Sequence, residues 1–405
     1  MTAAAVTTAV AADPGSAVDP GVGVVVDRIA GSIDRWAGSL IGLSHAIHAD
    51  PEVSGQEFRA ARRVGELLRT AGFAPDERRP SLPTALSARR GHGDLVAAVC
   101  VEYDALPEIG HACGHNVNAA TAVGAAIALA DVADQLGVTV KVLGTPAEET
   151  TGGKIDLIQE GFFDDVALAV MAHASGSDVV GGTSLAMSQW DARYDGRAAH
   201  AAAAPQQGVN ALDAVTLAQT AIGLARQQLP AGAIVSLIVT EGGRAVNVIP
   251  DHAAVSVEMR APRVEQLRLV EDRVRRCLEA GALATGCALA VTPAGHAFAD
   301  LRQDAFLAAA YRDSMTRRGR TVLVDDRPNA STDMGNVSHL VPSIHPLVGY
   351  DIGGAVHHSA EFAAHGASAS ADRAVLDGAF ALAAAVAAAA QDQEQRRRLI
   401  RGGAA

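Results

Sequence analysis

The sequence predicts an α/β protein in which a smaller ferredoxin-like domain, with the order βαββαβ, is inserted into a larger domain. Three observations support this fold class. The chain has 405 residues, more than one hydrophobic core usually contains. Apolar runs typical of buried strands alternate with helical segments in the first part of the chain, which favours an α/β sheet. The middle of the chain then follows the order strand, helix, strand, strand, helix, strand.

The larger domain begins with two helices and continues with buried strands. Apolar residues recur at helical spacing over residues 26–47 and 57–71, with a turn-forming segment between them. Largely apolar runs over 94–103, 139–145 and 166–173 predict strands buried on both faces, and 117–136 predicts a helix. The ends of these strands are expected to gather on one side of the sheet.

The inserted domain is expected over residues 188–296. Its elements follow in order: a strand from Ser188, a helix over 210–228, strands over 234–240 and 253–260, a helix over 264–285 and a strand over 288–292. The larger domain is then expected over 23–187 and 297–395. Residues 1–22 read as a flexible leader, because they lack a basic segment and contain early aspartates. The alanine-rich stretch 379–390 is shorter than the roughly 20 residues that a bilayer requires, so it predicts a packed C-terminal helix.

The composition excludes several classes of partner. The formal net charge of −12, from 33 Lys and Arg against 45 Asp and Glu, argues against nucleic acid. The basic run 396–398 is expected to be a solvated part of a terminal tail. No segment predicts a membrane span. Four scattered cysteines are too few for a disulfide scaffold, which favours a reducing, cytoplasmic location.

The densest motif is Gly110-His-Ala-Cys-Gly-His-Asn116, directly after a strand and turn. One glycine separates Cys113 from His115, so both side chains can converge on one point. A thiolate with an imidazole suits Zn, Ni, Co or Mn. A buried structural cysteine beside a helix-capping histidine is, for this motif alone, an equally good interpretation.

A second motif, Gly144-Thr-Pro-Ala-Glu-Glu149, ends another buried strand and is followed by Gly-Gly-Lys154. Two adjacent carboxylates there require a nearby cation if both are ionised. One of them can bind metal while the other accepts a proton from a metal-activated water. The alternative is an exposed acidic helix start, which leaves the Gly-Gly-Lys unexplained.

Isolated histidines complete the candidate set. His173 ends the predicted strand 166–173, and His357 and His358 lie in a glycine-rich loop near the C-terminus. A lone histidine is more often a satisfied polar residue than a ligand, so these assignments depend on the others. Cys113, His115, Glu149, His173 and His358 make five candidate ligands, more than one catalytic zinc uses, which favours two ions.

These motifs together resemble the M20 family of metallopeptidases and amidohydrolases. The strings HACGH, GTPAEE with GGK, and His358-Ser-Ala-Glu-Phe362 carry the resemblance, which extends from about His45 to Ser370. The Cys-Gly-His form resembles subfamily D, which includes aminobenzoyl-glutamate hydrolases and N-acyl amino acid hydrolases. The string 103–116 is most similar to the dipeptidase-like members. The resemblance implies a zinc-peptidase-like catalytic domain, an inserted lid and dimerisation domain, and a homodimer.

The resemblance also implies residue roles. Glu148 would be the general base and later the acid, and Glu149 a metal ligand. Cys113 would bridge the ions, and His115, His173 and His358 would complete their ligands. His358 is preferred to His357 because His-Ser-Ala-Glu-Phe matches the family pattern. Many members have Asp where this chain has Asn116, which bears on subtype more than on activity.

Further roles fall on the inserted domain and on two loops. His200, from the partner subunit, would stabilise the oxyanion, and Asn247 and Arg260 would hold the substrate carboxylate. Asp104 would orient a ligand, and the segment 331–338 would line the substrate pocket. Each of His200, Asn247 and Arg260 is alternatively an ordinary surface, turn or strand residue.

The sequence therefore predicts a metal-dependent hydrolase that uses two divalent ions to cleave an amide bond of a small carboxylate-bearing substrate. An N-acyl amino acid, aminobenzoyl-glutamate and a dipeptide are all candidates. The alternative is a catalytically silent metal-binding or regulatory protein, which the presence of both Glu148 and His200 disfavours. A serine hydrolase is not expected, because the Gly-x-Ser-x-Gly elbow is missing from the sequence.

Overall fold

Six strands form the larger sheet, in the order β1–β2–β4–β3–β5–β13. The computed structural model describes residues 20–76, 80–325, 327 and 330–402. The strands of this sheet are β1 (Ala74–Pro75), β2 (Leu86–Arg90), β3 (Leu95–Val101), β4 (Val138–Gly144), β5 (Leu168–Val170) and β13 (Ser343–Ile344). β3 is parallel to β4 and β5, and β13 is parallel to β5, whereas β1 and β2 add an antiparallel edge. The carboxyl ends of β3, β4 and β5 therefore lie at the same edge of the sheet.

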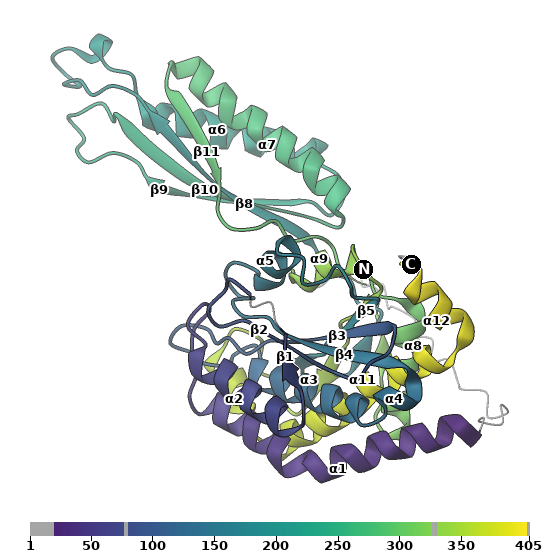
Figure 1. Cartoon of the computed structure of the whole chain (residues 1–405). Coiled ribbons are helices and arrows are strands. Elements are labelled where there is room, and N and C mark those ends of the chain that lie inside the picture. Colours follow the sequence, from purple (N-terminus) through teal and green to yellow (C-terminus); the bar gives the residue numbers. More distant parts are fainter. Residues whose placement is uncertain (1–19, 77–79, 326, 328–329, 403–405) are drawn as a thin grey trace, which may run out of the picture.

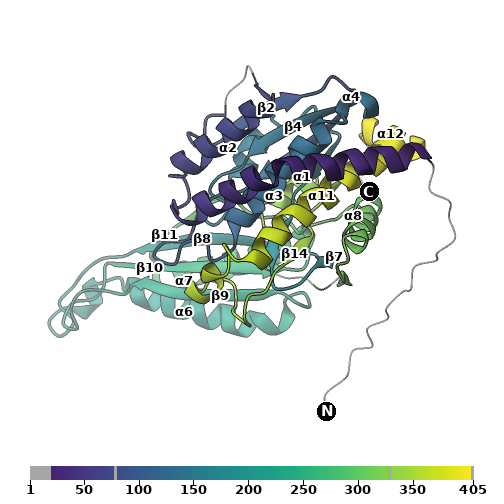
Figure 2. The ribbon, with the colours of Figure 1, turned by 90° about the horizontal axis from the view of Figure 1, so that it is seen from below.

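Helices cover both faces of this sheet, as the apolar strands predict. Alternate residues of β3 point to opposite sides. Val99 and Val101 belong to the core beneath α1 (Pro20–His48), α3 (His115–Ala130) and α11 (Ala369–Gln391), which pack together on one face (Figure 2). Cys100 belongs to a second apolar cluster on the other face, beside α5 (Gly153–Gln159) and α9 (Met334–Ser338).

The remaining helices of the larger domain lie around this core. They are α2 (Phe58–Thr70), α4 (Ala133–Leu136), α8 (Ala305–Arg317), α10 (Ala360–Ala364) and α12 (Gln393–Ile400). α11 is the one helix in the described part of the chain that is long and apolar enough to cross a bilayer, but 83% of its most apolar window is buried inside the protein. It contacts α1, α3 and α8, which confirms the predicted packed C-terminal helix.

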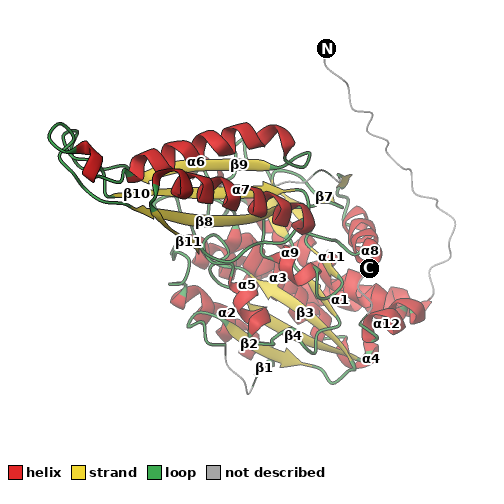
Figure 3. Ribbon diagram, turned by 90° about the horizontal axis from the view of Figure 1, so that it is seen from above, coloured by secondary structure: helices red, strands yellow, loops and turns green. Residues whose placement is uncertain are grey.

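The inserted domain has the predicted βαββαβ order. Its elements are β8 (Ala186–Asp195), α6 (Ala211–Ala225), β9 (Ile234–Glu241), β10 (His252–Ala261), α7 (Val264–Thr285) and β11 (Ala288–Pro293). The strands pair antiparallel in the order β11–β8–β10–β9, and both helices cover one face of the sheet (Figures 1 and 3). A separate apolar cluster fills the space between the sheet and the helices, so this unit has its own core.

A third, smaller sheet lies beside the larger one and corrects one prediction. Its order is β12–β7–β14–β6, with β6 (His173–Ser175), β7 (Val179–Val180), β12 (Leu323–Val324) and β14 (Leu347–Gly349). The single strand predicted over 166–173 is wrong: the chain leaves the larger sheet after Val170, and His173 begins β6 in the smaller sheet. A continuous apolar run does not reveal such a change of sheet.

Two other predictions also differ from the structure. The helix predicted over 117–136 is interrupted near Asp131, whose carboxylate lies 2.7 Å from Arg35 and 3.0 Å from Arg90. The basic run 396–398 is not a solvated tail, because it lies on α12, where Arg396 donates to the carbonyl of Leu136 and Arg398 pairs with Asp304. The predicted leader lies mostly in residues 1–19, outside the described residues, and α1 begins at Pro20.

Candidate metal centre and active site

A pocket opens where the strands of the larger sheet end. Its wall includes Cys113, Glu148, Glu149, His173, His357 and His358, which come from four segments far apart in the sequence. The parallel arrangement of β3, β4 and β5 brings the first three segments together, because each follows a strand that ends at the same edge of the sheet. His357 and His358 follow β14 of the smaller sheet. The sequence prediction that the motifs meet at one edge is therefore confirmed at the level of the fold.

Gly114 shapes the turn that carries Cys113 and His115. It has a φ of +71° and directly precedes α3. A Cβ atom at this position would lie 2.5 Å from the Cβ of Ala174, so the turn needs both the left-handed backbone and the missing side chain of glycine. The turn leaves the Cys113 sulfur and the His115 ring close to the same carboxylate, that of Glu149.

Asp104 fixes the orientation of the His115 ring. The Nδ1 atom of His115 lies 2.9 Å from the backbone oxygen of Asp104 and 3.1 Å from its Oδ1. The Nε2 atom therefore faces the other way, toward Glu102 Oε2 and Glu149 Oε1, each 3.7 Å away. Among the residues that the structure describes, this buried Nε2 has no hydrogen-bond partner. An imidazole held through one nitrogen, with its other nitrogen free, is the usual arrangement of a metal ligand.

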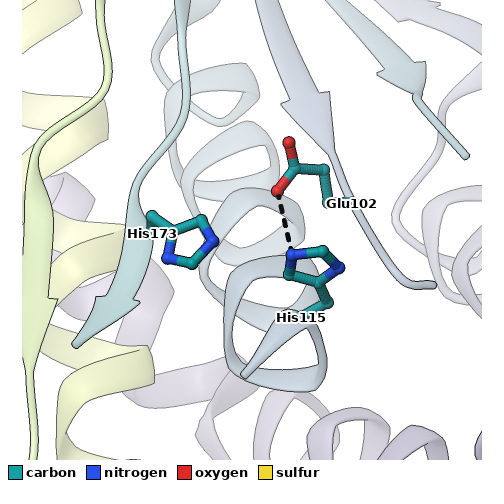
Figure 4. Close-up of side chains that lie close together, drawn as sticks. All are labelled: Glu102, His115 and His173. Atoms are coloured by element: carbon teal, nitrogen blue, oxygen red, sulfur yellow. Dashed lines mark ion pairs between the residues drawn. The ribbon is translucent and has the colours of Figure 1, made fainter. Parts of the chain in front are cut away.

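The spacing of the donor atoms fits a metal ion. Separations of 3.7 Å are too long for hydrogen bonds. Two ligands of one tetrahedral ion, each about 2.1 Å from it, are about 3.4 Å apart. Donor atoms of Cys113, His115 and Glu149 all lie within 4.8 Å of one another, as do those of Glu102, His115 and His173 (Figure 4). Each group is suited to hold a divalent ion, but His115 can give its Nε2 to only one of them, because its Nδ1 is held by Asp104.

His173 contributes a neutral imidazole to this cluster. Its Nδ1 lies 2.9 Å from the carbonyl oxygen of Ala174, and its ring meets that of His115 edge to face, with centroids 5.4 Å apart. Burial, reinforced by the neighbouring His115, lowers the pKa of His173 to about 3. A neutral imidazole is the form that binds metal.

The two histidines of the C-terminal loop have different contacts. The Nε2 atom of His358 lies 3.7 Å from Glu149 Oε2, which repeats the spacing seen at His115. His357 lies 3.0 Å from the carbonyl oxygen of Ala174 through its Nε2, and its ring packs on Phe362 with centroids 4.3 Å apart. This geometry supports the choice of His358 as the residue nearer the metal donors.

Glu148 lies beside the donors in an acidic environment. Its carboxylate is within 4.8 Å of those of Glu102 and Asp333. Burial, together with these two carboxylates and Glu149, raises the pKa of Glu148 well above its usual value. A carboxyl group with a raised pKa can take up a proton and return it, which is what a general base that later acts as an acid must do.

Sequence reasoning missed Glu102, named Asp333 only as part of the pocket-lining segment 331–338, and gave no role to Lys154. Lys154 is completely buried, and its Nζ donates to Glu102 and to Asp333, in the latter case over 2.6 Å. The signal for Glu102 was an acidic residue at the end of an otherwise apolar strand, where a charge needs a buried partner. His345 was also missed: it lines the pocket, and its ring centroid is 5.6 Å from that of His173.

One chain does not bring all the predicted substrate-binding residues to the pocket. Neither His200 nor Asn247 is among the described residues that line it. His200 is exposed, and its Nδ1 accepts hydrogen bonds from the backbone of Ala202 and Ala203. Arg260 pairs with Glu258, but its Nη1 lies 3.3 Å from the hydroxyl of Ser331, which is part of the pocket wall.

The side chain of Asn116 holds neighbouring segments of the larger domain together. Its Nδ2 donates to the hydroxyl of Ser44 on α1 and to the backbone oxygen of Gly366. These two bonds connect the start of α3 to the N-terminal helix and to the C-terminal loop. Asn116, which stands where many M20 members have Asp, therefore makes its hydrogen bonds away from the metal donor atoms.

The fold, the donor groups and the proton-holding Glu148 define a metal-dependent hydrolase, and comparison with known proteins identifies its family. Residues 187–285 match the peptidase dimerisation domain of M20 proteins. The chain is 37% identical to Xaa-Arg dipeptidase of Mus musculus, over 92% of this chain and 90% of that protein. It is 35% identical to a p-aminobenzoyl-glutamate hydrolase polypeptide of Escherichia coli, over 60% and 55% of the two chains.

A solved structure has the same fold. The dinuclear metal-binding M20 peptidase of Bacillus subtilis superposes with a TM-score of 0.66 at 21% identity, over 87% of this chain and 98% of the other. The chain belongs to the M20 peptidase family, and it is a metal-dependent hydrolase of amide bonds. The named relatives are dipeptidases and hydrolases, and they give no support to the catalytically silent alternative.

Proposed function

We propose that this protein hydrolyses the amide bond of a small substrate with a free carboxylate, using two divalent ions and Glu148. The observation that carries the proposal is the free, buried Nε2 of His115, which lies 3.7 Å from each of two carboxylates. One of these carboxylates, that of Glu149, lines the pocket together with Glu148. Cys113, His115, Glu149, His173 and His358 would hold the ions. Zn, Mn, Co and Ni all suit this mixture of sulfur, nitrogen and oxygen donors.

The protein side chains have separate duties in this reaction. When bound, the ions would supply Lewis-acid activation of the scissile carbonyl and of the attacking water. Glu148 takes a proton from that water and returns it to the leaving nitrogen. Arg260 and Asn247 hold the substrate carboxylate, and His200 of the partner subunit stabilises the oxyanion.

Dipeptides are the substrates that we propose to test first. The relative aligned over most of the chain is named an Xaa-Arg dipeptidase, whereas the p-aminobenzoyl-glutamate hydrolase aligns over a smaller part. Dipeptides with a C-terminal basic residue therefore precede aminobenzoyl-glutamate and N-acyl amino acids in the screen. Each of these compounds presents a free carboxylate next to the scissile amide.

A homodimer would complete the site. β9 is an edge strand of the inserted sheet and exposes apolar side chains, with Ile238 65% and Val239 42% exposed. An open edge of this kind offers unpaired backbone groups to a second strand. We propose that two copies pair near β9 and that this pairing brings His200 to the neighbouring pocket. We also propose a cytoplasmic location, which is supported by the four cysteines, each a free thiol.

Replacing Glu148 by Gln tests the proposal. The variant keeps the size of the side chain but cannot accept the proton, so kcat should fall about 10²- to 10⁴-fold while KM and the number of bound ions change little. Glu279→Gln, at an exposed position on α7, is the matched control and should retain full activity. Near-normal turnover by the Glu148 variant would remove this residue from the mechanism. A wild-type protein that binds two ions but hydrolyses none of the substrates would revive the silent alternative.

A further inference from the structure

We propose that Glu57 is a positioning residue for the general base Glu148, which it holds through the backbone N–H of Ala147. The inference rests on the proposed function, because it requires that Glu148 takes the proton. Glu57 directly precedes α2 and lies 90 positions before Ala147 in the chain. Its exposed fraction is 0%, so its carboxylate serves groups inside the protein rather than solvent.

The Glu57 carboxylate joins two segments that are distant in the sequence. Its Oε1 accepts hydrogen bonds from the backbone N–H of Ala147 over 2.9 Å and from that of Gly55 over 2.8 Å. Its Oε2 accepts from the hydroxyl of Thr84 over 2.8 Å. Gly55 belongs to the loop between α1 and α2, whereas Ala147 follows β4 and directly precedes Glu148. Ala147 is buried, so its N–H would have no water to replace this acceptor.

Ala147 has a backbone conformation that requires support. Its φ is +58°, in the left-handed region that residues other than glycine seldom occupy. Its carbonyl oxygen accepts hydrogen bonds from the N–H groups of Thr151 and Gly152, over 3.1 and 2.9 Å, so the turn after Glu148 folds back on it. Residues in such a conformation persist only where the surrounding structure determines them, and they concentrate at functional sites. Glu57 fixes the N–H side of Ala147, and the turn fixes its carbonyl side.

A second carboxylate holds the other side of Glu148. The Oδ2 atom of Asp104 accepts a hydrogen bond of 3.1 Å from the N–H of Glu149 and one of 2.8 Å from the hydroxyl of Ser54. Ser54 lies in the same loop as Glu57. The backbone is therefore anchored at the residue before Glu148 and at the residue after it, in both cases with support from the loop between α1 and α2.

The position of a general base sets the rate of the reaction that it serves. The base must lie within hydrogen-bond reach of the water from which it takes a proton. A displacement of about 1 Å, even one caused by a distant change, can slow a reaction about 100-fold. Without the acceptor on Glu57, Ala147 loses a constraint on its left-handed conformation, and Glu148 shifts with it. Asp104 still holds Glu149, so the expected signature is a lower kcat with little change in KM or in the number of bound ions.

Two variants of Glu57 test this role in the full-length, metal-loaded protein, with the dipeptide that the wild type hydrolyses fastest as the substrate. Glu57→Met removes the acceptor and should lower kcat about 10- to 100-fold, with KM nearly unchanged. The ions, counted by elemental analysis, should stay as in the wild type. Glu57→Gln keeps an oxygen for the two N–H groups, and its amide can donate to the hydroxyl of Thr84. It should therefore restore most of the wild-type kcat.

Glu52→Met is the matched control. The carboxylate of Glu52 is also buried and lies in the same loop, but it accepts from the backbone N–H groups of Arg59 and Ala60 on α2, over 2.8 and 2.9 Å. The control therefore removes a buried carboxylate and its backbone hydrogen bonds without changing the acceptor of Ala147. It should lose stability but keep the kcat of the wild type.

The outcomes separate this inference from the proposed function. A wild type that hydrolyses none of the proposed substrates, or a Glu148→Gln variant with normal kcat, would overturn both. If Glu148→Gln is slow as expected, three results would overturn only the role of Glu57: a wild-type kcat in Glu57→Met, a Glu57→Gln variant as slow as Glu57→Met, or an equal loss of kcat in Glu52→Met. Loss of an ion together with kcat in Glu57→Met would also overturn it, because the change would then act on the metal ligands.

A shorter acid decides the question if Glu57→Met does not fold. Glu57→Asp keeps the charge, but its oxygens no longer reach the N–H of Ala147. If Glu57 acts by holding that N–H, the kcat of Glu57→Asp should lie below that of Glu57→Gln. The reverse order would show that the charge matters and the hydrogen bond does not, which contradicts the assignment.

Discussion

Removing the buried ammonium of Lys154 should destabilise the protein strongly. The side chains of Lys154, Glu102 and Asp333 all have an exposed fraction of 0%, so Lys154→Met leaves two carboxylates in the interior without their cation. Breaking a buried ion pair by removing one partner costs about 3–5 kcal/mol, because the remaining charge is neither hydrated nor paired. We expect the free energy of unfolding of the chelator-treated protein to fall by about this amount.

A double variant tests the electrostatic origin of this loss. Lys154→Met together with Asp333→Asn removes one positive and one negative charge, so the net charge of the cluster stays the same. The double variant should be less destabilised than the sum of the two single variants by about 1–3 kcal/mol. Burial raises the pKa of Asp333 already in the wild type. In Lys154→Met the folded state should hold protons more tightly than the unfolded state, so the loss of stability should shrink as the pH falls from 8 to 5.

Urea unfolding followed by circular dichroism measures both effects. Lys154→Arg, which keeps the charge, is the matched variant and should show a smaller loss than Lys154→Met. An unfolding midpoint of Lys154→Met equal to that of the wild type would refute the view that Lys154 neutralises these carboxylates. Strict additivity of the two single variants at every pH would refute the coupling between Lys154 and Asp333.

Three further predictions concern other parts of the molecule. Gly114→Ala should lower the free energy of unfolding by about 1–3 kcal/mol and weaken metal binding, because the turn needs a positive φ and the new Cβ would collide with Ala174. Urea unfolding and chelator competition measure the two effects. The pKa of His111 is lowered to about 3 by burial, so below about pH 6.5 the unfolded state binds the proton first, and stability falls toward pH 3. In metal-free protein, His111→Gln should flatten this slope by roughly 1 kcal/mol per pH unit, and an unchanged slope would contradict the assignment. Ile238→Lys on β9 should shift the protein to monomers in sedimentation and lower its activity, whereas the same change at the exposed Leu283 of α7 should not; a dimeric Ile238 variant would exclude pairing at this edge.

Local patterns were sufficient for the two-domain organisation and for most elements of the inserted domain. Apolar runs identified β3 and β4, and the middle segment predicted the βαββαβ order of the inserted domain, because burial on one or both faces imposes a periodicity that a short stretch of sequence displays. The same holds for the motif loops. A loop that follows a buried parallel strand must emerge at the carboxyl edge of the sheet, so the strand pattern alone predicts that Cys113, His115 and Glu149 lie near one another.

Long-range packing decided the remaining features. That His173 begins a strand of a different sheet, and that His358 faces Glu149 while His357 packs on Phe362, depends on how distant segments meet.

Long-range packing also decided which buried charged side chains are partners. Glu102 and Asp333 lie 231 positions apart in the chain, and only the folded core brings both to Lys154. The sequence by itself therefore determined the main elements, the order of the domains and the class of chemistry. The tertiary structure decided which side chains share the buried charge and face the metal donors, because a charge removed from water must be matched by whatever distant groups the fold brings to it.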